Sequence, residues 1–94
     1  MNERETATLI EKEIIPDLKF KKHLEVEQSP NLRAKLIEAT RLGNIHHGKM
    51  RINFIDDDGP KTVETTIWAT GSKFICLKGG IWLPISRINS LNII

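Results

Sequence analysis

The chain has 94 residues, of which 39% are hydrophobic and 28% charged, and its formal net charge is +2. A chain of this length and composition fits one domain around one hydrophobic core, and neither a disordered nor a fibrous chain is expected. No apolar run approaches the ~18 residues that span a bilayer, and residues 1–15 lack the pattern of a secretion signal, so we expect a cytoplasmic protein without membrane contact.

A first helix is predicted at the start of the chain. Asn2 can cap it, Glu5 follows at the spacing of a capping box, and apolar residues recur at helical spacing as far as Ile15. Pro16 ends the pattern. In residues 17–28 apolar and polar positions alternate instead, which favours an extended segment.

A second helix is predicted over residues 30–42. Ser29 supplies an N-cap hydroxyl, and Pro30 suits the first helical position, where its missing N–H costs nothing. Gly43 follows the helix and is expected to have the positive φ of a left-handed C-cap. Apolar residues on one side of this helix are predicted to be buried: Leu32, Leu36, Ile37, Ala39 and Leu42.

From Lys49 on, apolar residues alternate with polar ones, as they do in half-buried strands. The turns carry an acidic run at residues 56–58 and small residues at positions 71–72 and 79–80. Pro84 cannot donate a hydrogen bond to a neighbouring strand, so its strand should lie at an edge or end there. The predicted strands are residues 49–54, 61–70, 73–78, 81–85 and 90–94, with a helical turn at residues 86–89.

The order of these elements resembles the small five-stranded barrels of the Sm-like and SH3-like type. The resemblance covers residues 49–94 and is clearest in residues 81–91. In Sm-like proteins a helix precedes the first strand, and the helix predicted over residues 30–42 occupies that place here. The predicted fold class is α+β, with N-terminal helices followed by a five-stranded antiparallel SH3-like or Sm-like barrel. The alternative is an open antiparallel sheet covered by two helices, because a short one-sided sheet must close or be covered. The whole chain is also similar to small bacterial proteins.

One domain is predicted over residues 1–94, with the first helix and the extended segment in residues 1–28 and the second helix and the barrel in residues 29–94. At least one of Gly79 and Gly80 should have positive φ, because a two-residue hairpin requires it. Apolar residues on the apolar side of their elements are predicted to share one core: Leu32, Leu36, Ile52, Phe54, Val63, Ile67, Ile75, Leu83 and Ile88.

The sequence contains no recognisable catalytic or metal-binding motif. Cys76 is the only cysteine and has no assignable basic partner, so it is expected to be a small side chain in or near the core. His46 and His47 are adjacent and point to opposite sides of an extended chain, which suits a metal poorly. The acidic run at residues 56–58 lacks calcium-loop spacing and is expected to form a solvated hairpin tip. We expect no enzyme activity, no metal and no cofactor.

Two groups of residues are candidate binding surfaces. Trp68 and Trp82 lie on the opposite parity from the apolar set of their strands, and exposed indoles next to Lys and Arg side chains suit base stacking or a protein hot spot. Pro84, which flanks Trp82, is then also expected at the surface. The alternative is that the strands bend and that both rings pack beneath a helix. The second group is a run of cationic side chains that would attract phosphate or carboxylate: Arg41, His46, His47, Lys49 and Arg51.

The leading functional hypothesis is a non-catalytic module that binds a protein partner or associates with itself, for example along a strand edge after Pro84. The alternative, which the resemblance to Sm-like proteins implies, is a protein that binds single-stranded nucleic acid. Residues 31–94 carry nine Lys and Arg against five Asp and Glu, whereas residues 1–30 carry five against seven. The second part of the chain is therefore mildly attractive to an anionic partner.

Overall fold

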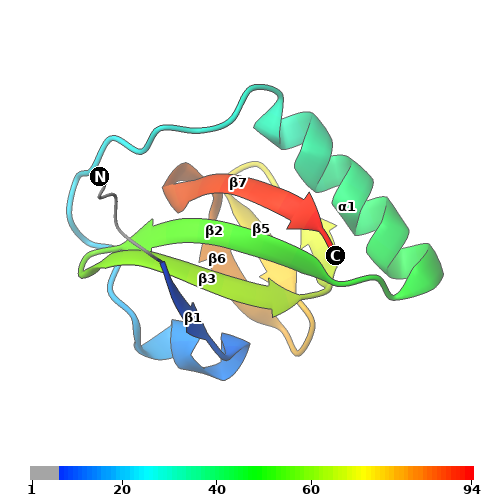
Figure 1. Cartoon of the computed structure of the whole chain (residues 1–94), viewed down its shortest axis with the longest axis horizontal. Helices are drawn as coiled ribbons and strands as arrows, with labels where there is room; N and C mark the ends of the chain where they lie inside the picture. Colours follow the sequence, from blue (N-terminus) through cyan, green and yellow to red (C-terminus); the bar gives the residue numbers. More distant parts are fainter. Residues whose placement is uncertain (1–6) are drawn as a thin grey trace.

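The structure is a computed structural model that describes residues 7–94 (Figure 1). Its helices are the α-helix α1 (Leu32–His46) and the short 3-10 helices η1 (Lys12–Asp17) and η2 (Ile85–Arg87). Its strands are β1 (Thr8–Ile10), β2 (Met50–Asp56), β3 (Gly59–Thr65), β4 (Ile67–Thr70), β5 (Phe74–Leu77), β6 (Ile81–Pro84) and β7 (Ile88–Ile93). A four-stranded sheet has the order β1-β3-β2-β7, and a three-stranded sheet has the order β4-β5-β6.

The predicted five-stranded barrel is wrong, because in residues 7–94 seven strands form two sheets without a closed barrel. Part of the difference lies in the strand predicted over residues 61–70. Thr65, Thr66 and Ile67 are all buried, so the alternation of one straight strand is broken there. The chain bends at this point, so that β3 pairs with β2 while β4 pairs with β5. The alternative of one open sheet beneath two helices is also wrong, since residues 7–94 form two sheets and one α-helix.

The prediction that helices begin the chain is wrong as well. Residues 8–10 form β1, which runs parallel to β3 and pairs Ile10 with Val63. This pairing covers the edge of β3 and outweighs the helical spacing of the apolar residues. η1 follows and contains Pro16. The predicted capping residues, Asn2 and Glu5, lie outside the described residues.

The helix α1 lies in mid-chain and continues past Leu42, where the sequence pattern predicts its end. It begins after Asn31 and ends before His47, and both flanking residues are left-handed, with φ of 62° and 56°. The predicted C-cap role of Gly43 is therefore wrong, since Gly43 lies inside the helix. The β5–β6 turn confirms the other glycine prediction, because φ is positive in both of its glycines, 92° at position 79 and 81° at position 80.

Gly43 is buried where α1 crosses β4. A Cβ atom there would lie 2.7 Å from the carbonyl oxygen of Ile67 and 2.9 Å from Cγ2 of Thr66. Both distances are shorter than a carbon side chain tolerates, so this position requires glycine because of close packing and not because of its backbone conformation. The glycine lets α1 lie directly on β4.

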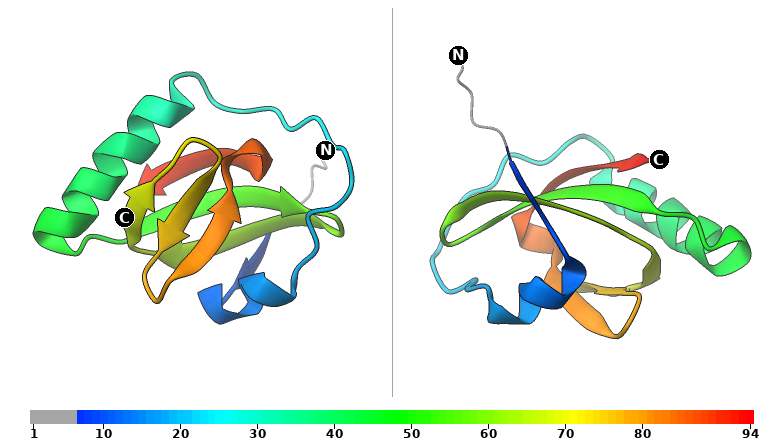
Figure 2. Two further views of the ribbon diagram at one scale, coloured as in Figure 1. Left: turned by 180° about the vertical axis from the view of Figure 1, so that it is seen from behind. Right: turned by 60° about the horizontal axis from the view of Figure 1, so that its bottom comes forward.

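Figure 2 shows how the two sheets and α1 are arranged around one another. One cluster of buried apolar side chains, drawn from both sheets and α1, forms the core. It contains all of the residues predicted to share a core, so that prediction is confirmed. Ile37 is the exception among the predicted helix residues: it is 54% exposed, because it lies outside the buried stripe that runs through Leu36 and Ala39. α1 contacts both β4 and β7 and so covers the opening between the sheets. No helix in residues 7–94 is long and apolar enough to cross a bilayer.

Candidate functional site

The outer side of the β4-β5-β6 sheet carries most of the exposed aromatic residues. β5 and β6 are antiparallel, with Cys76 opposite Trp82 and Phe74 opposite Pro84. Successive side chains point to opposite sides of a strand, so these four share the outer side while their neighbours enter the core. We call the following set the aromatic face: Trp68, Phe74, Cys76, Trp82 and Pro84. Figure 2 (left) shows its sheet from behind the view of Figure 1.

Of the two alternatives left open for the indoles, the structure supports exposure. Trp82 is 58% exposed and Trp68 is 46% exposed, as is Phe74. The alternative, in which a bent strand buries both rings, is wrong although the strand does bend. The bend comes at Thr66, ahead of Trp68, and the β4–β5 register shifts between Ile67 and the residue after Trp68. Trp68 therefore lies in the irregular part of β4, on the outer side.

A groove of about 560 Å³ adjoins the aromatic face and shares Phe74 and Pro84 with it. We call it the side groove. One of its walls comes from the irregular segment between η1 and α1, which crosses the outside of the molecule (Figure 1). The side groove is lined by Phe20, Gln28, Ser72, Lys73, Phe74, Pro84, Ile85 and Ser86.

A buried arginine holds this wall in place. The side chain of Arg87 is 5% exposed, and its guanidinium carbon lies 5.6 Å from the centroid of the Phe20 ring. Arg87 donates hydrogen bonds to the carbonyl oxygen of Ile55 at 3.1 Å, to Oδ1 of Asp57 at 2.9 Å, and to the carbonyl oxygen of Lys22. A charge this deeply buried persists only with such partners. Arg87 therefore joins the segment, the β2–β3 hairpin and η2.

Asp57 completes the attachment from the other side. Its carboxylate accepts hydrogen bonds from the backbone N–H groups of Lys21, at 3.0 Å, and Lys22, at 3.2 Å. Burial acts to raise the pKa of Asp57, but the hydrogen bonds from Arg87 and from these two N–H groups outweigh it, and the pKa is lowered. The backbone of the segment is thus fixed, while Lys21 and Lys22 are exposed.

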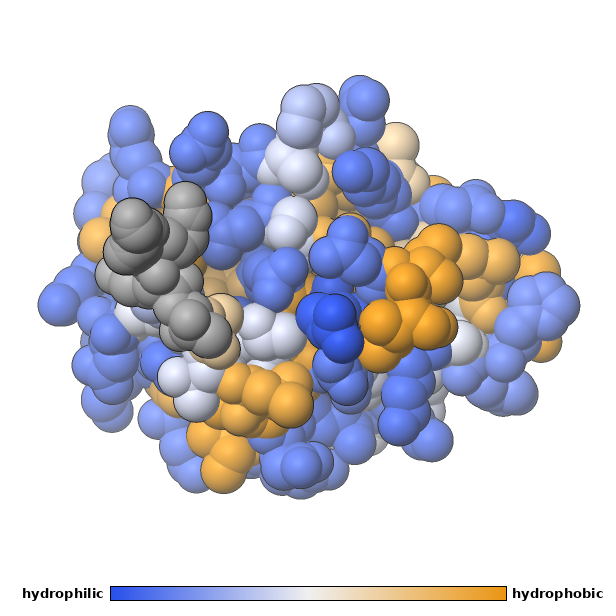
Figure 3. All heavy atoms as spheres, viewed as in Figure 1, coloured by the Kyte–Doolittle hydropathy of each residue, from blue (hydrophilic) through white to orange (hydrophobic). Residues whose placement is uncertain are grey.

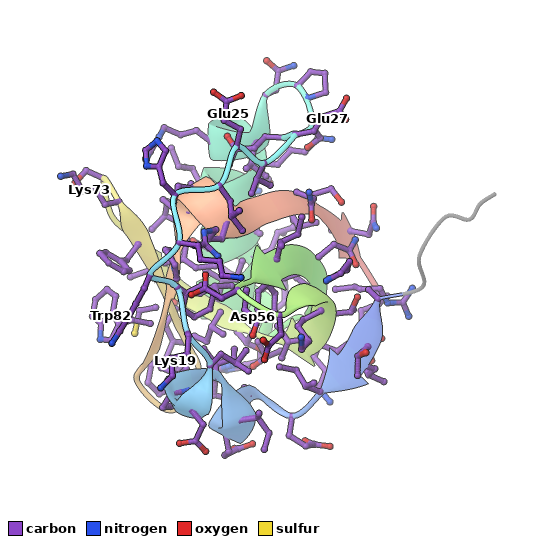
Figure 4. All side chains as sticks on the ribbon, turned by 90° about the vertical axis from the view of Figure 1, so that its left-hand side faces the viewer. Lys19, Glu25, Glu27, Asp56, Lys73 and Trp82 are labelled. Atoms are coloured by element: carbon purple, nitrogen blue, oxygen red, sulfur yellow. The ribbon has the colours of Figure 1, made fainter. Side chains whose placement is uncertain are left out.

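The charged residues in the part of the chain that forms the aromatic face are all positive. Residues 65–94 contain no Asp or Glu, and Lys73 and Lys78 lie at the two ends of β5. Figure 4 shows Lys73 and Lys19 on the same side as Trp82, whereas Glu25 and Glu27 project from another side of the molecule. η1, which packs against β6, brings two further carboxylates, Glu13, which is paired with Lys12 at 3.1 Å, and the exposed Asp17.

Comparison of the chain with protein-family models, curated proteins and solved structures finds no match.

Two of the five residues in the predicted cationic run form ion pairs in the folded chain. Arg41 is paired with Glu38 on α1, and Arg51 is paired with Glu64 across β2 and β3 at 2.8 Å. The remaining members are exposed: His46 is the last residue of α1, and His47 and Lys49 lie in the connection between α1 and β2. A binding role for this run stays a prediction. No Asp or Glu lies between residues 39 and 55, but the fold pairs Arg41 with Glu38 and Arg51 with Glu64 from outside that stretch.

The prediction of a solvated acidic hairpin tip is wrong for two of its three aspartates. Asp56 is 1% exposed and accepts a hydrogen bond from Lys61 Nζ at 2.9 Å and others from the N–H groups of Asp58 and Gly59. Asp57 binds Arg87. Asp58 alone is exposed. These carboxylates organise the hairpin, and no group of three metal-ligating side chains occurs in residues 7–94.

Sequence reasoning missed Phe74, Phe20 and Arg87. Phe74 lies on the same side of β5 as Cys76, and its neighbour Ile75 points into the core. Strict alternation along the strand would therefore have placed Phe74 outside. No comparable signal exists for Phe20 and Arg87, because their partners are far away in sequence and the irregular segment has no period that fixes direction.

The other side of the molecule has a different character. The view onto β2, β3 and β7 is largely hydrophilic, with separate apolar patches (Figure 3). A groove of about 390 Å³ runs between α1 and the end of β7. It is lined by Ala34, Lys35, Glu38, Ala39, Leu91, Asn92 and Ile93. Its two charges have opposite sign, and none of its residues is aromatic.

Proposed function

We propose that this chain is a non-catalytic interaction module that binds its partner through the aromatic face. The distribution of its aromatic residues carries the proposal. The chain has three phenylalanines and two tryptophans, and of these only Phe54 belongs to the core. Trp68, Phe74 and Trp82 are exposed, and Phe20 lines the side groove. Three of the five aromatic side chains are thus exposed on one side of the β4-β5-β6 sheet, and Phe20, which packs partly against the core, lines the groove beside them.

This distribution is unfavourable for a small protein that has no partner. A buried aromatic ring removes about 150 to 250 Å² of surface from water, and a short chain has few other large side chains with which to build a core. Contiguous exposed apolar surface on a soluble domain marks a contact site, and Trp is enriched among the residues that dominate binding energy. Contact with a partner would bury the rings that the fold leaves outside.

The chemistry of the surface supports binding over catalysis. Cys76 is its one nucleophilic side chain, and the neighbours opposite it in the sheet are Trp82 and Ala69, neither of which can act as a base. Ser72 and Ser86 in the side groove have no histidine or carboxylate among the groove's lining residues. An aromatic surface of this kind gives affinity through burial and does not activate a substrate.

Site-specific photo-crosslinking tests the proposal. A benzoylphenylalanine placed at Trp82 or at Phe74 should give discrete adducts in extracts of cells that express the protein. The matched control is the same group at Leu9, which is 62% exposed, much like Trp82, but lies on β1 in the other sheet. Self-association would give a crosslinked dimer, and another partner would give a heterologous adduct.

Two results would contradict the proposal. One is the absence of adducts from both positions on the aromatic face. The other is an equal yield from Leu9, which would indicate nonspecific capture. As a further check, Trp68→Ala should reduce the yield from position 82, because both residues belong to one contact surface and hot-spot side chains act together.

A further inference from the structure

We infer that the partner is a single-stranded nucleic acid, whose bases stack on the aromatic face and whose phosphates contact the lysines around it. The inference rests on the proposed function and names its ligand. Three features of the described residues lead to it: the separation of the rings, the sign of the surrounding charge and the lining of the side groove.

The exposed rings are separate from one another. The only aromatic pair in residues 7–94 joins Phe20 to the core residue Phe54, so Trp68, Phe74 and Trp82 do not stack among themselves. Phe74 and Trp82 are diagonal neighbours across β5 and β6, an arrangement that separates side chains by about 7–8 Å. Each ring can therefore receive a base of its own, which is how sequence-tolerant single-strand binders use aromatic residues.

The charge around these rings favours phosphate over a protein surface. Lysine is depleted in protein–protein interfaces relative to the rest of the surface. Here Lys73 and Lys78 bracket β5, and Lys19 lies on the same side of the molecule (Figure 4). Lys21 and Lys22 are also exposed, and Asp57 fixes the backbone of their segment. The strands β4, β5 and β6 carry no Asp or Glu that would repel a phosphate chain.

The side groove continues the same chemistry. It combines the Phe20 and Phe74 rings with Lys73 and the hydroxyl groups of Ser72 and Ser86. Its volume of about 560 Å³ falls in the range of pockets that hold small ligands, which includes the size of a nucleotide. Unstacked bases are held by aromatic stacking, with hydroxyl and amide groups binding their edges. A strand that crosses the aromatic face can place one nucleotide in this groove.

Titration with fluorescently labelled oligo(dT) and oligo(U) tests the inference. At low salt we expect both to bind, with quenching of tryptophan fluorescence, and the affinity should fall steeply as salt rises. Measured by fluorescence anisotropy, Trp82→Ala should weaken binding by about tenfold, the scale of one lost base stack. Lys19→Gln combined with Lys73→Gln should make the slope of log K against log salt shallower by about 0.7 for each phosphate contact removed.

The controls use residues on other surfaces. Leu9→Ala matches Trp82→Ala in exposure, and Lys35→Gln removes an exposed lysine from α1. Neither should change affinity or the salt slope by more than about twofold or 0.2, respectively, because neither lies at a phosphate or base contact. A larger effect of Lys35→Gln than of the double lysine variant would overturn the inference.

The inference is also wrong if neither oligonucleotide binds at low salt. Photo-crosslinking then separates it from the proposed function. A protein adduct at position 82 that resists nuclease would overturn the nucleic-acid ligand and leave the interaction module in place. The absence of any adduct would overturn both. A nuclease-sensitive adduct at position 82, with none at Leu9, supports both.

Discussion

Phe54 and Phe74 show how differently one residue type can be used within the same small domain. Phe54 is fully buried between the sheets, whereas Phe74 is 46% exposed on the aromatic face. We predict that Phe54→Ala lowers the free energy of unfolding by about 3 to 5 kcal/mol, because the surrounding core cannot fill the cavity. Phe74→Ala should cost less than about 1 kcal/mol, as for an exposed site. Urea denaturation measures both, and equal losses would contradict the placement of the two rings.

Gly43 provides a second test at the same scale. Alanine is the better helix former by about 1 kcal/mol, so propensity alone predicts that Gly43→Ala stabilises α1. The distance between the added alanine Cβ and the Ile67 carbonyl oxygen would be only 2.7 Å. This contact predicts the opposite result, because the backbone cannot move aside as a flexible side chain can. We expect a loss of about 1 to 3 kcal/mol in urea denaturation. Gly48→Ala, with nothing within 4 Å of its Cβ, is the matched control, and a stabilised Gly43→Ala would contradict the packing.

At the scale of elements, the segment between η1 and α1 depends on distant partners. The alternation of its residues predicts an extended chain over residues 17–28, whereas Asp17 ends η1 and residues 18–28 belong to no strand. Its attachments are the Asp57 carboxylate and the Arg87 guanidinium, both more than thirty residues further along the chain from the lysines that they bind. A sequence pattern describes local geometry, and contacts over such distances leave no period in it.

The Asp57 attachment makes the stability of this element depend on pH. Because the pKa of Asp57 is lowered in the folded state, its contribution is complete above the ordinary pKa of the carboxyl group and is lost as the pH falls through the lowered value. We predict that Asp57→Asn destabilises the protein at neutral pH and that the difference from wild type shrinks on acidification to about pH 3. Urea denaturation across this range measures it.

Asp58→Asn, at the exposed neighbouring aspartate, is the control for Asp57→Asn and should have a smaller effect at neutral pH. If the destabilisation by Asp57→Asn stayed constant or grew as the pH fell, the carboxylate would not be the source of the stabilisation.

At the scale of the whole molecule, the sequence predicts the contents of the core better than its architecture. Alternation and helical spacing identified the core residues, because one buried face leaves a period in the sequence. They did not predict two sheets, since the bend at Thr66 and the pairing of β1 with β3 depend on tertiary contacts. Strand alternation was sufficient for Trp82 because β6 is short and regular. The side groove could not be predicted, because its walls come from three separate parts of the chain.

The position of Cys76 makes the reaction rate of its thiol a measure of whether a ligand covers the aromatic face. It is the only thiol in the chain, it lies directly opposite Trp82, and it is partly exposed. The rate at which a maleimide alkylates it therefore reports on a single place, the middle of the aromatic face. A ligand of any kind that covers the neighbouring rings must also block the reagent, so a dissociation constant can be obtained from alkylation kinetics alone, without labelling the ligand and without changing a residue.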